Sequence, residues 1–345
     1  MSNIEIELGP IRPPSESQSL LFRVTRGCHW NKCFFCGLYK GMRFSVRPTE
    51  DIIAEVRATA ERYGVRGMMF KSCFLQDGDA FNIPTGDLLR ILTTIKTYFP
   101  SLQTITSYAR CDSIMRKSEM EVQELADAGL NHLYRGIESG SDTILQNIHK
   151  GITAEQIVVS GQRCRSAGMM LSEFTLLGIG GKALAEENAI ETARVINAVN
   201  PEFIRVHHTA FKPNTKLGRD VERGAFDLQS EEEIVREQHL FIERLEGIDS
   251  FYVNEHIVNL ILEVRGKLPD EMGNMLQIIN QYLAMSEDDK LNFAMGRRTG
   301  QYYHLADMGN KHKKSAVSNV IANLREQNPA VDFDRVCNDL RANMI

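Results

Sequence analysis

The sequence predicts an α/β fold on a parallel sheet, and two observations carry this prediction. Apolar strand-like runs alternate with amphipathic helical stretches from residue 19 to about residue 210, which gives six strands and five intervening helices. Several helical stretches also start with Thr or Ser, and three end in Gly, as helix caps favour. Repeated β-α units imply parallel strands joined by right-handed crossovers, which fits a doubly wound sheet or a barrel.

Each element follows from its local pattern in chain order. The predicted strands are apolar runs at residues 20–26, 67–73, 102–110, 130–138, 169–178 and 202–210. The predicted helices have amphipathic patterns and cover residues 49–64, 85–99, 118–129, 153–168 and 184–200.

The alternation stops after about residue 218, where we predict a domain boundary. Residues 230–345 have mostly helical patterns, and the clearest predicted helices are 230–247 and 274–295. We therefore predict a loose N-terminal leader (1–18), an α/β core (19–218) and a mostly helical C-terminal extension (219–345). The 345 residues, 43% of them hydrophobic, are enough for one large domain with such an extension.

Charge and composition limit the partners and the location. The net charge of -5 provides no overall basic field, so nucleic acid is an unlikely partner. We find no signal peptide and no apolar run of membrane-spanning length, so we expect a cytoplasmic protein without a membrane partner. In that reducing setting Cys73, Cys111, Cys164 and Cys337 are expected to be buried thiols.

The remaining three cysteines form a C-x4-C-x2-C cluster. Cys28, Cys33 and Cys36 lie within nine residues, directly after the first predicted strand. Three thiolates in one loop suit an iron–sulfur cluster or zinc. A closed zinc site needs four ligands, and His29 is poorly placed because it directly follows Cys28. The pattern therefore favours a [4Fe–4S] cluster with one iron left open, and zinc is the alternative.

The segment TRGCHWNKCFFCGLYK (25–40) resembles the cluster loop of the radical S-adenosylmethionine (SAM) superfamily. Members have three cysteines after the first strand and an aromatic residue before the last cysteine, which is Phe35 in this chain. The usual spacing has three residues between the first two cysteines, and this chain has four. The resemblance implies a partial (β/α)6 TIM-type barrel with an Elp3/MiaB/HemN-like core.

The same resemblance implies further cofactor-binding residues. Asp77, Gly78 and Asp79 match the turn after the second strand, whose backbone binds the SAM amino group in the superfamily. On residue pattern alone this triplet is a weak signal, since most such triplets are surface turns.

The segment YRGIESGSDTIL (134–145) resembles the part after strand four in the subgroup of methylthiotransferases, cobalamin-dependent radical enzymes and oxygen-independent coproporphyrinogen dehydrogenase. There, a polar residue at the position of Glu138, with Ser139 beside it, bonds the ribose hydroxyls. A carboxylate can accept hydrogen bonds from both hydroxyls of a diol. Lys150 matches the basic residue that pairs with the SAM carboxylate, and Gly178 matches the glycine at the end of strand five, which lines the adenine.

Candidate substrate-contacting residues lie near other predicted strand ends. Cys73 and Cys111 are placed at the ends of strands two and three, where barrel active sites collect, although small apolar packing is the more common role of such cysteines. His207 and His208 should point to opposite faces of the sixth strand, so at most one of them points inward. The stretch 297–314 mixes basic and aromatic residues, as RNA-binding surfaces and solvated charged faces both do.

The resemblance implies a radical SAM enzyme. One electron, from a flavodoxin- or ferredoxin-like low-potential donor, would cleave SAM at the [4Fe–4S] cluster and yield a 5′-deoxyadenosyl radical that abstracts hydrogen from a substrate. The sequence does not identify that substrate. The alternative hypothesis is a non-catalytic zinc-binding protein associated with RNA.

Overall fold

The computed structural model describes residues 7–344, which divide into two compact units. The first unit contains the described residues up to Ile137 together with Gly151–Glu173. The second contains Glu138–Lys150 and the described chain from Phe174 onward. The boundary predicted near residue 218 falls inside the second unit and stays a prediction.

A mostly parallel sheet is the centre of the fold. In the described chain it has eight strands in the order β1-β4-β5-β6-β7-β8-β9-β10. The neighbours β1–β4, β4–β5, β5–β6 and β8–β9 pair parallel, and β9–β10 pair antiparallel. The predicted α/β fold of the partial-barrel type is confirmed. The strands are β1 (Leu20–Arg23), β4 (Ser72–Gln76), β5 (Thr104–Tyr108), β6 (Leu130–Glu138), β7 (Met170–Leu177), β8 (Phe203–His208), β9 (Phe251–Val253) and β10 (Gly266–Lys267).

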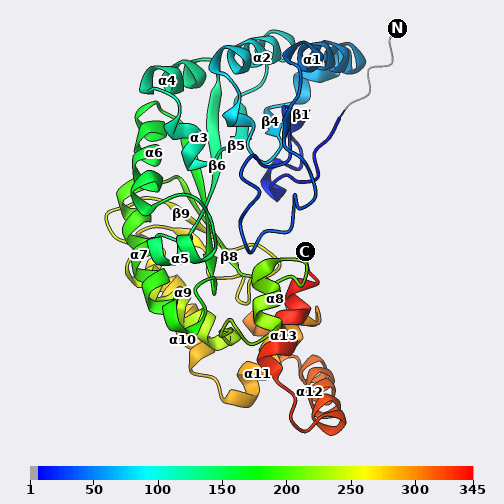
Figure 1. Cartoon of the computed structure of the whole chain (residues 1–345). Helices are drawn as coiled ribbons and strands as arrows, with labels where there is room; N and C mark the ends of the chain where they lie inside the picture. Colours follow the sequence, from blue (N-terminus) through cyan, green and yellow to red (C-terminus); the bar gives the residue numbers. More distant parts are fainter. Residues whose placement is uncertain (1–6, 345) are drawn as a thin grey trace. The chain divides into compact units, whose positions relative to one another are not determined.

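Helices of the first unit follow the predicted positions closely, and α1 and α2 pack side by side (Figure 1). The longer helices bury an apolar stripe, as in α2, where Leu88, Ile91, Leu92 and Ile95 are buried. The helices are α1 (Thr49–Tyr63), α2 (Thr85–Tyr98), α3 (Cys111–Met115), α4 (Glu119–Asp127) and α6 (Ala154–Ser166), with 3-10 turns at Pro14–Glu16, Gly64–Met69 and Ala80–Asn82.

The second unit contains the remaining helices, and in it α9 packs against both α7 and α10. The helices are α5 (Asp142–Asn147), α7 (Ala185–Val199), α8 (Lys216–Glu222), α9 (Glu231–Glu243), α10 (Met272–Leu283), α11 (Glu287–Arg298), α12 (Lys311–Gln327) and α13 (Phe333–Ala342), with 3-10 turns at Lys182–Leu184 and Leu305–Gly309.

Several predicted elements differ from the structure. The predicted strand 20–26 is two strands, β1 (Leu20–Arg23) and β2 (Thr25–Arg26), which belong to different sheets. The second strand is Ser72–Gln76 rather than 67–73, because Gly64–Met69 forms a 3-10 turn that leaves Met69 exposed. The predicted helix 274–295 is two helices, since Ser286 caps a new helix with its side chain. The C-terminal region also contributes β9 and β10 to the sheet, which the mostly helical prediction missed.

The N-terminal leader is attached rather than loose from Glu7 onward. Glu7 accepts hydrogen bonds from Arg23 at 3.0 Å and from Arg26 at 2.7 Å. The Gly9 backbone N–H donates to the Gln76 side chain at 2.9 Å. The first six residues of the predicted leader lie outside the described residues. Among the described residues, no helix is both long and apolar enough to cross a membrane.

Candidate active site

The three clustered cysteines lie on an irregular loop, residues 27–44, which we call the cysteine loop. Its ends are joined by β2 (Thr25–Arg26) and β3 (Ser45–Val46), which pair antiparallel. Cys33 is buried, whereas Cys28 and Cys36 are partly exposed, and none of the three forms a disulfide. The loop therefore carries three free thiols within nine residues, and two of them are partly accessible to solvent.

Backbone contacts fix the conformation of the cysteine loop. Asn31 has a positive φ of 43° and donates from its side-chain amide to the Tyr39 carbonyl at 2.7 Å. Lys40 donates back to the Asn31 carbonyl at 2.9 Å. Asn tolerates this left-handed backbone better than most residues, so it suits a tight turn at this position.

Asp77 is a buried carboxylate beneath the cysteine loop. Its side chain has no exposed surface and accepts hydrogen bonds from Arg23 at 2.8 Å, from the Gly27 backbone N–H at 3.2 Å and from the Tyr39 hydroxyl. Burial and the bond to Asp77 raise the pKa of Tyr39. Since Gly27 directly precedes Cys28, the Asp77 carboxylate fixes the point where the loop begins.

Gly78 brings the next turn against the loop. A Cβ added at Gly78 would lie 2.8 Å from the Tyr39 ring and 3.3 Å from Cβ of Cys28. Only glycine therefore fits without a shift of the neighbouring side chains. Asp77, Gly78 and Asp79, which sequence reasoning singled out, do lie beside the cysteine loop.

His29 is bound between two carboxylates. Its Nδ1 lies 2.9 Å from Asp79 and its Nε2 lies 2.9 Å from Asp112. Burial lowers the pKa of His29, but the hydrogen bonds to Asp112 and Asp79 raise it by more, so that the pKa is about 9. The pKa of Asp112 is correspondingly about 2, because His29 and Arg110 offset its burial. Both ring nitrogens of His29 thus face carboxylates, which makes the ring a poor fourth metal ligand.

The Arg110 cation interacts electrostatically with two of the clustered cysteines. Burial lowers the pKa of the Arg110 guanidinium, but the charges of Asp112, Cys33 and Cys28 raise it overall. The Arg110 guanidinium also lies 5.5 Å from the centroid of the Trp30 ring. Trp30 in turn leaves room only for glycine at position 151, where a Cβ would come within 2.3 Å of the ring.

The donor set fits an iron–sulfur cluster. In residues 7–344 no three His, Cys, Asp or Glu side chains converge on one metal ion. A cubane does not require such convergence, because each cysteine binds a different iron. Three reduced thiols on one loop with the Arg110 cation beside them suit an anionic iron–sulfur group.

Glu138 and Lys150, predicted from the sequence as separate cofactor contacts, lie together in the second unit. The Lys150 ammonium donates to the Glu138 carboxylate at 2.7 Å, and both side chains are largely buried. Glu138 ends β6 with a φ of 68°, which is unusual for a residue with a side chain. A strained residue at a strand end is a common feature of functional sites.

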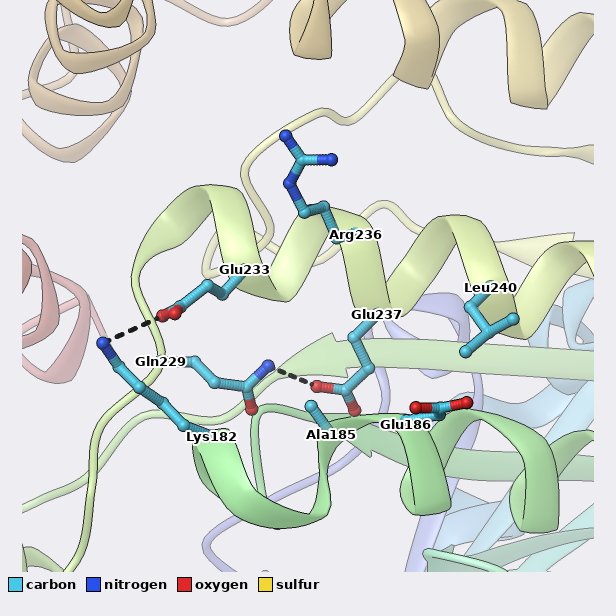
Figure 2. A pocket seen from close by; sticks show the side chains of 8 residues that line it. All are labelled: Lys182, Ala185, Glu186, Gln229, Glu233, Arg236, Glu237 and Leu240. Atoms are coloured by element: carbon cyan, nitrogen blue, oxygen red, sulfur yellow. Dashed lines mark hydrogen bonds and ion pairs between the residues drawn. The ribbon is translucent and has the colours of Figure 1, made fainter.

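Ser139 and Gly178 have protein partners in the second unit, and their assignment to the cofactor stays a prediction. Ser139 is fully buried and donates to the Asn188 side chain at 2.6 Å. Gly178 has a φ of 82°, and its backbone N–H donates to Glu237 at 3.1 Å. Glu237 belongs to a pocket of about 250 Å³, also lined by Lys182, Gln229 and Glu233 (Figure 2). Sequence reasoning did not find Glu237, since nothing in its local pattern separates it from other helical glutamates.

The candidate cysteines outside the cluster are buried packing residues. Cys73 is the second residue of β4, so the predicted position at the end of that strand is wrong. Cys73 is fully buried, and burial raises the pKa of its thiol. Cys111 is also buried, three residues beyond β5, near Arg135 and Cys164. These surroundings favour the packing role.

His207 and His208 point to opposite faces of β8, as predicted. His208 is buried with its Nδ1 3.9 Å from Glu231, and burial lowers its pKa to about 4. The His207 ring centroid lies 4.2 Å from that of His256 and 5.3 Å from that of Phe174. Burial, followed by the charge of His256, lowers the pKa of His207 as well. Both histidines are therefore neutral at pH 7 in the folded protein.

The stretch 297–314 is buried in part at its start, whereas residues farther along it, such as Lys311 and His312, are exposed. Arg297 donates to the Leu260 and Tyr302 carbonyls at 2.9 Å, and Arg298 donates to Glu231 at 2.7 Å. Both guanidinium groups and the Tyr302 ring are buried. These side chains stabilise the second unit and are not available to RNA.

Curated relatives of this chain modify tRNA. The chain is 28% identical to tRNA-2-methylthio-N(6)-dimethylallyladenosine synthase of Acidithiobacillus ferrooxidans over 218 residues, which are 60% of this chain and 46% of that protein. It is 22% identical to the probable threonylcarbamoyladenosine tRNA methylthiotransferase of Methanothermobacter thermautotrophicus, over 62% of this chain and 50% of the relative. The chain thus spans about half the length of these relatives. Their names give no support to the expectation that nucleic acid is an unlikely partner or to the zinc-protein alternative.

A solved structure and a family model agree on the fold. The cobalamin-dependent SAM radical enzyme OxsB, with aqua-cobalamin and SAM bound, matches with a TM-score of 0.52 and 14% identity, over 94% of this chain and 53% of that one. The model of the radical SAM superfamily matches residues 22–194, half of the chain. The chain therefore belongs to the radical SAM superfamily, whose members are enzymes with a [4Fe–4S] cluster and S-adenosylmethionine as cofactors.

Proposed function

We propose that the protein cleaves SAM reductively and that the cysteine loop is its cluster-binding element. The observation that supports this most directly is the loop itself, in which Cys28, Cys33 and Cys36 are free thiols and the charges of Cys28 and Cys33 interact with Arg110. When bound, the cluster and SAM supply, with one electron from a low-potential donor, a 5′-deoxyadenosyl radical that abstracts hydrogen from the substrate.

The chain's own residues keep the loop in a defined conformation. Asp77 accepts from the Gly27 N–H and from Tyr39, so the two ends of the cysteine-bearing segment share one buried carboxylate. The charge of Arg110 interacts with Cys28 and Cys33, which suits an anionic cluster on this loop. A fixed loop is what a cluster site requires.

The SAM-binding residues are proposed from the family resemblance. We assign the turn Asp77–Asp79 and the aromatic Phe35 to the cluster side of the cofactor. We assign Glu138 to the ribose hydroxyls, Lys150 to the SAM carboxylate and Gly178 to the adenine. Lys150 and Glu138 form a buried ion pair in which each side chain orients the other. This pair supports the assignment of these two residues to the cofactor.

We propose a nucleoside in tRNA as the substrate class and the reducing cytoplasm as the location. The relatives that are 28% and 22% identical to this chain are named for tRNA modification. The four cysteines outside the loop are scattered and buried, so they offer no second three-cysteine group in the described chain. The reaction on tRNA is thus proposed as radical modification, with the transferred group left open.

The test is anaerobic reconstitution with iron and sulfide, followed by reduction with dithionite in the presence of SAM. The proposal predicts formation of 5′-deoxyadenosine by the reconstituted protein, and faster formation when tRNA is added. Stoichiometric zinc without SAM cleavage would reject the radical SAM function. SAM cleavage that is indifferent to tRNA would reject the substrate class alone.

A further inference from the structure

A buried polar network in the second unit links helix α9 to the segment Glu138–Ser141. Gly140 lies directly on α7, because a Cβ at that position would come within 2.2 Å of the Glu191 carbonyl oxygen and 2.6 Å of Cα of Thr192. The Gly140 N–H donates to the Thr192 hydroxyl at 2.9 Å. The segment that carries Glu138 is therefore docked on one side of α7.

Asn188 connects this segment to the rest of the network. Its side-chain oxygen accepts from Ser139 at 2.6 Å, and its side-chain nitrogen donates to the Leu176 carbonyl at 2.9 Å and to Glu237 at 2.6 Å. Asn188 is buried, so both ends of its amide are committed to protein partners. An amide with all of these bonds has only one orientation that satisfies them.

Glu237 is where the network ends. One carboxylate oxygen accepts from Asn188, and the other accepts from the Gly178 N–H at 3.1 Å and from Gln229 at 2.8 Å. Figure 2 shows the bond to Gln229 across the pocket between α9 and α7. Glu237 is only 3% exposed, and the three groups that donate to it are neutral amides.

Such an acid is costly to the fold. Burial raises the pKa of Glu237 to about 7, and the three hydrogen bonds lower it only in part. An acid that is buried without a cation costs folding free energy and is therefore a candidate for a functional role. Gln229 adds to the folding cost of this network, since its side-chain oxygen is buried without a hydrogen-bond partner among the described residues.

We propose that Glu237 is a positioning residue for SAM: through Asn188 and the Gly178 N–H it fixes the Glu138–Ser141 segment and the turn after β7. This inference rests on the proposed function, which assigns Glu138 and Gly178 to the cofactor. Glu237 lies 59 residues beyond Gly178 and on another element, so its effect on the cofactor is exerted through these two contacts.

The test is SAM affinity of the Glu237→Gln variant, measured by equilibrium dialysis with radiolabelled SAM on the reconstituted protein. A glutamine can accept from only one side, so its NH2 group must face either the Asn188 donor or the Gly178 donor. We expect about tenfold weaker SAM binding, with kcat at saturating SAM little changed. Glu243→Gln, the same change on the exposed part of α9, should bind as the wild type does.

A double-mutant cycle separates positioning from general stability. If Glu237 acts through Asn188 on the Ser139 segment, then Glu237→Gln and Ser139→Ala have effects on SAM affinity that are not additive. Unchanged affinity in Glu237→Gln, or fully additive effects, would overturn the inference. Glu237→Asp, which keeps the charge but shortens the side chain, provides the second variant should Glu237→Gln fail to fold. A wild-type protein that binds no SAM would instead refute the proposed function.

Discussion

Asp77 in the first unit and Glu237 in the second are buried carboxylates with opposite kinds of partner. In the first unit, Asp77 accepts from the Arg23 guanidinium and Asp79 contacts the His29 ring, so each acid has a cationic or ionisable partner. In the second unit, Glu237 is equally buried but accepts only from neutral amides. The first arrangement fixes charges in place, and the second leaves a carboxyl group whose protonation is finely balanced.

The difference follows from the electrostatics of burial. An opposite charge within hydrogen-bonding distance lowers the pKa of an acid, as it does for Asp112, whose pKa is about 2. Neutral donors offset only part of the desolvation cost, which leaves the pKa of Glu237 at about 7. We therefore expect the stabilising contacts of Asp112 to be independent of pH near neutrality and the stabilising contribution of Glu237 to depend on it.

The largest effect is expected from Asp77→Asn. This change leaves Glu7 as the carboxylate partner of the buried Arg23 cation and removes the charge that accepts from Gly27 and Tyr39. Removing one member of a buried ion pair should cost about 3 kcal/mol. Urea unfolding of the variant measures the loss, and iron retention after reconstitution should fall with it.

The matched control for that change is Asp127→Asn, on the exposed end of α4. Asp127 is exposed and, among the described residues, accepts from the exposed Gln123 side chain, so its loss should cost well under about 1 kcal/mol. Equal stability of the Asp77 and Asp127 variants would contradict the role given to the buried carboxylate.

A smaller effect is expected from Gly140→Ala in the second unit. The added methyl group would overlap the backbone of Glu191 and Thr192, so the segment must move away from α7 at a cost of about 2 kcal/mol. Gly273→Ala is the control, since nothing lies within 4 Å of the added methyl group in α10. Thermal unfolding should separate the two variants clearly, and a stable Gly140→Ala protein would speak against close docking.

The last of these effects depends on pH. In the folded protein the pKa of Glu237 is raised from 4.5 to about 7. Its contribution to the free energy of unfolding is therefore present in full below about pH 4.5 and is lost as the pH rises through about 7. Between about pH 5 and about pH 8 the wild type should lose roughly 2 kcal/mol relative to Glu237→Gln. Parallel urea curves at the two pH values measure this; an unchanged difference would show that Glu237 does not titrate as proposed.

The sequence predicted the elements whose patterns are local. The strand at Leu130–Glu138 was predicted with the observed bounds, and the helix at 49–64 ends one residue earlier, at Tyr63. Both have apolar residues at the spacing of their element and clear ends. The second strand was shifted because the methionines of Gly64–Met69 resemble a buried strand in composition but are exposed.

Features that depend on distant contacts could not be predicted. β9 and β10 are three and two residues long, too short to give a periodic pattern, and they form by pairing with neighbouring strands. The cysteine cluster was found because its ligands are close in sequence. Glu237 was missed because its partners, Gly178, Asn188 and Gln229, come from three other places in the chain.

The most direct test of the account is the iron content of the reconstituted protein and its cysteine variants. The wild type and Cys337→Ala, which changes a buried thiol far along the chain from the loop, should each contain about four irons per chain. Cys28→Ala, Cys33→Ala and Cys36→Ala should each lose most of that iron and all SAM cleavage. Full iron content and full cleavage in any one of these three variants would contradict the assignment of the cysteine loop.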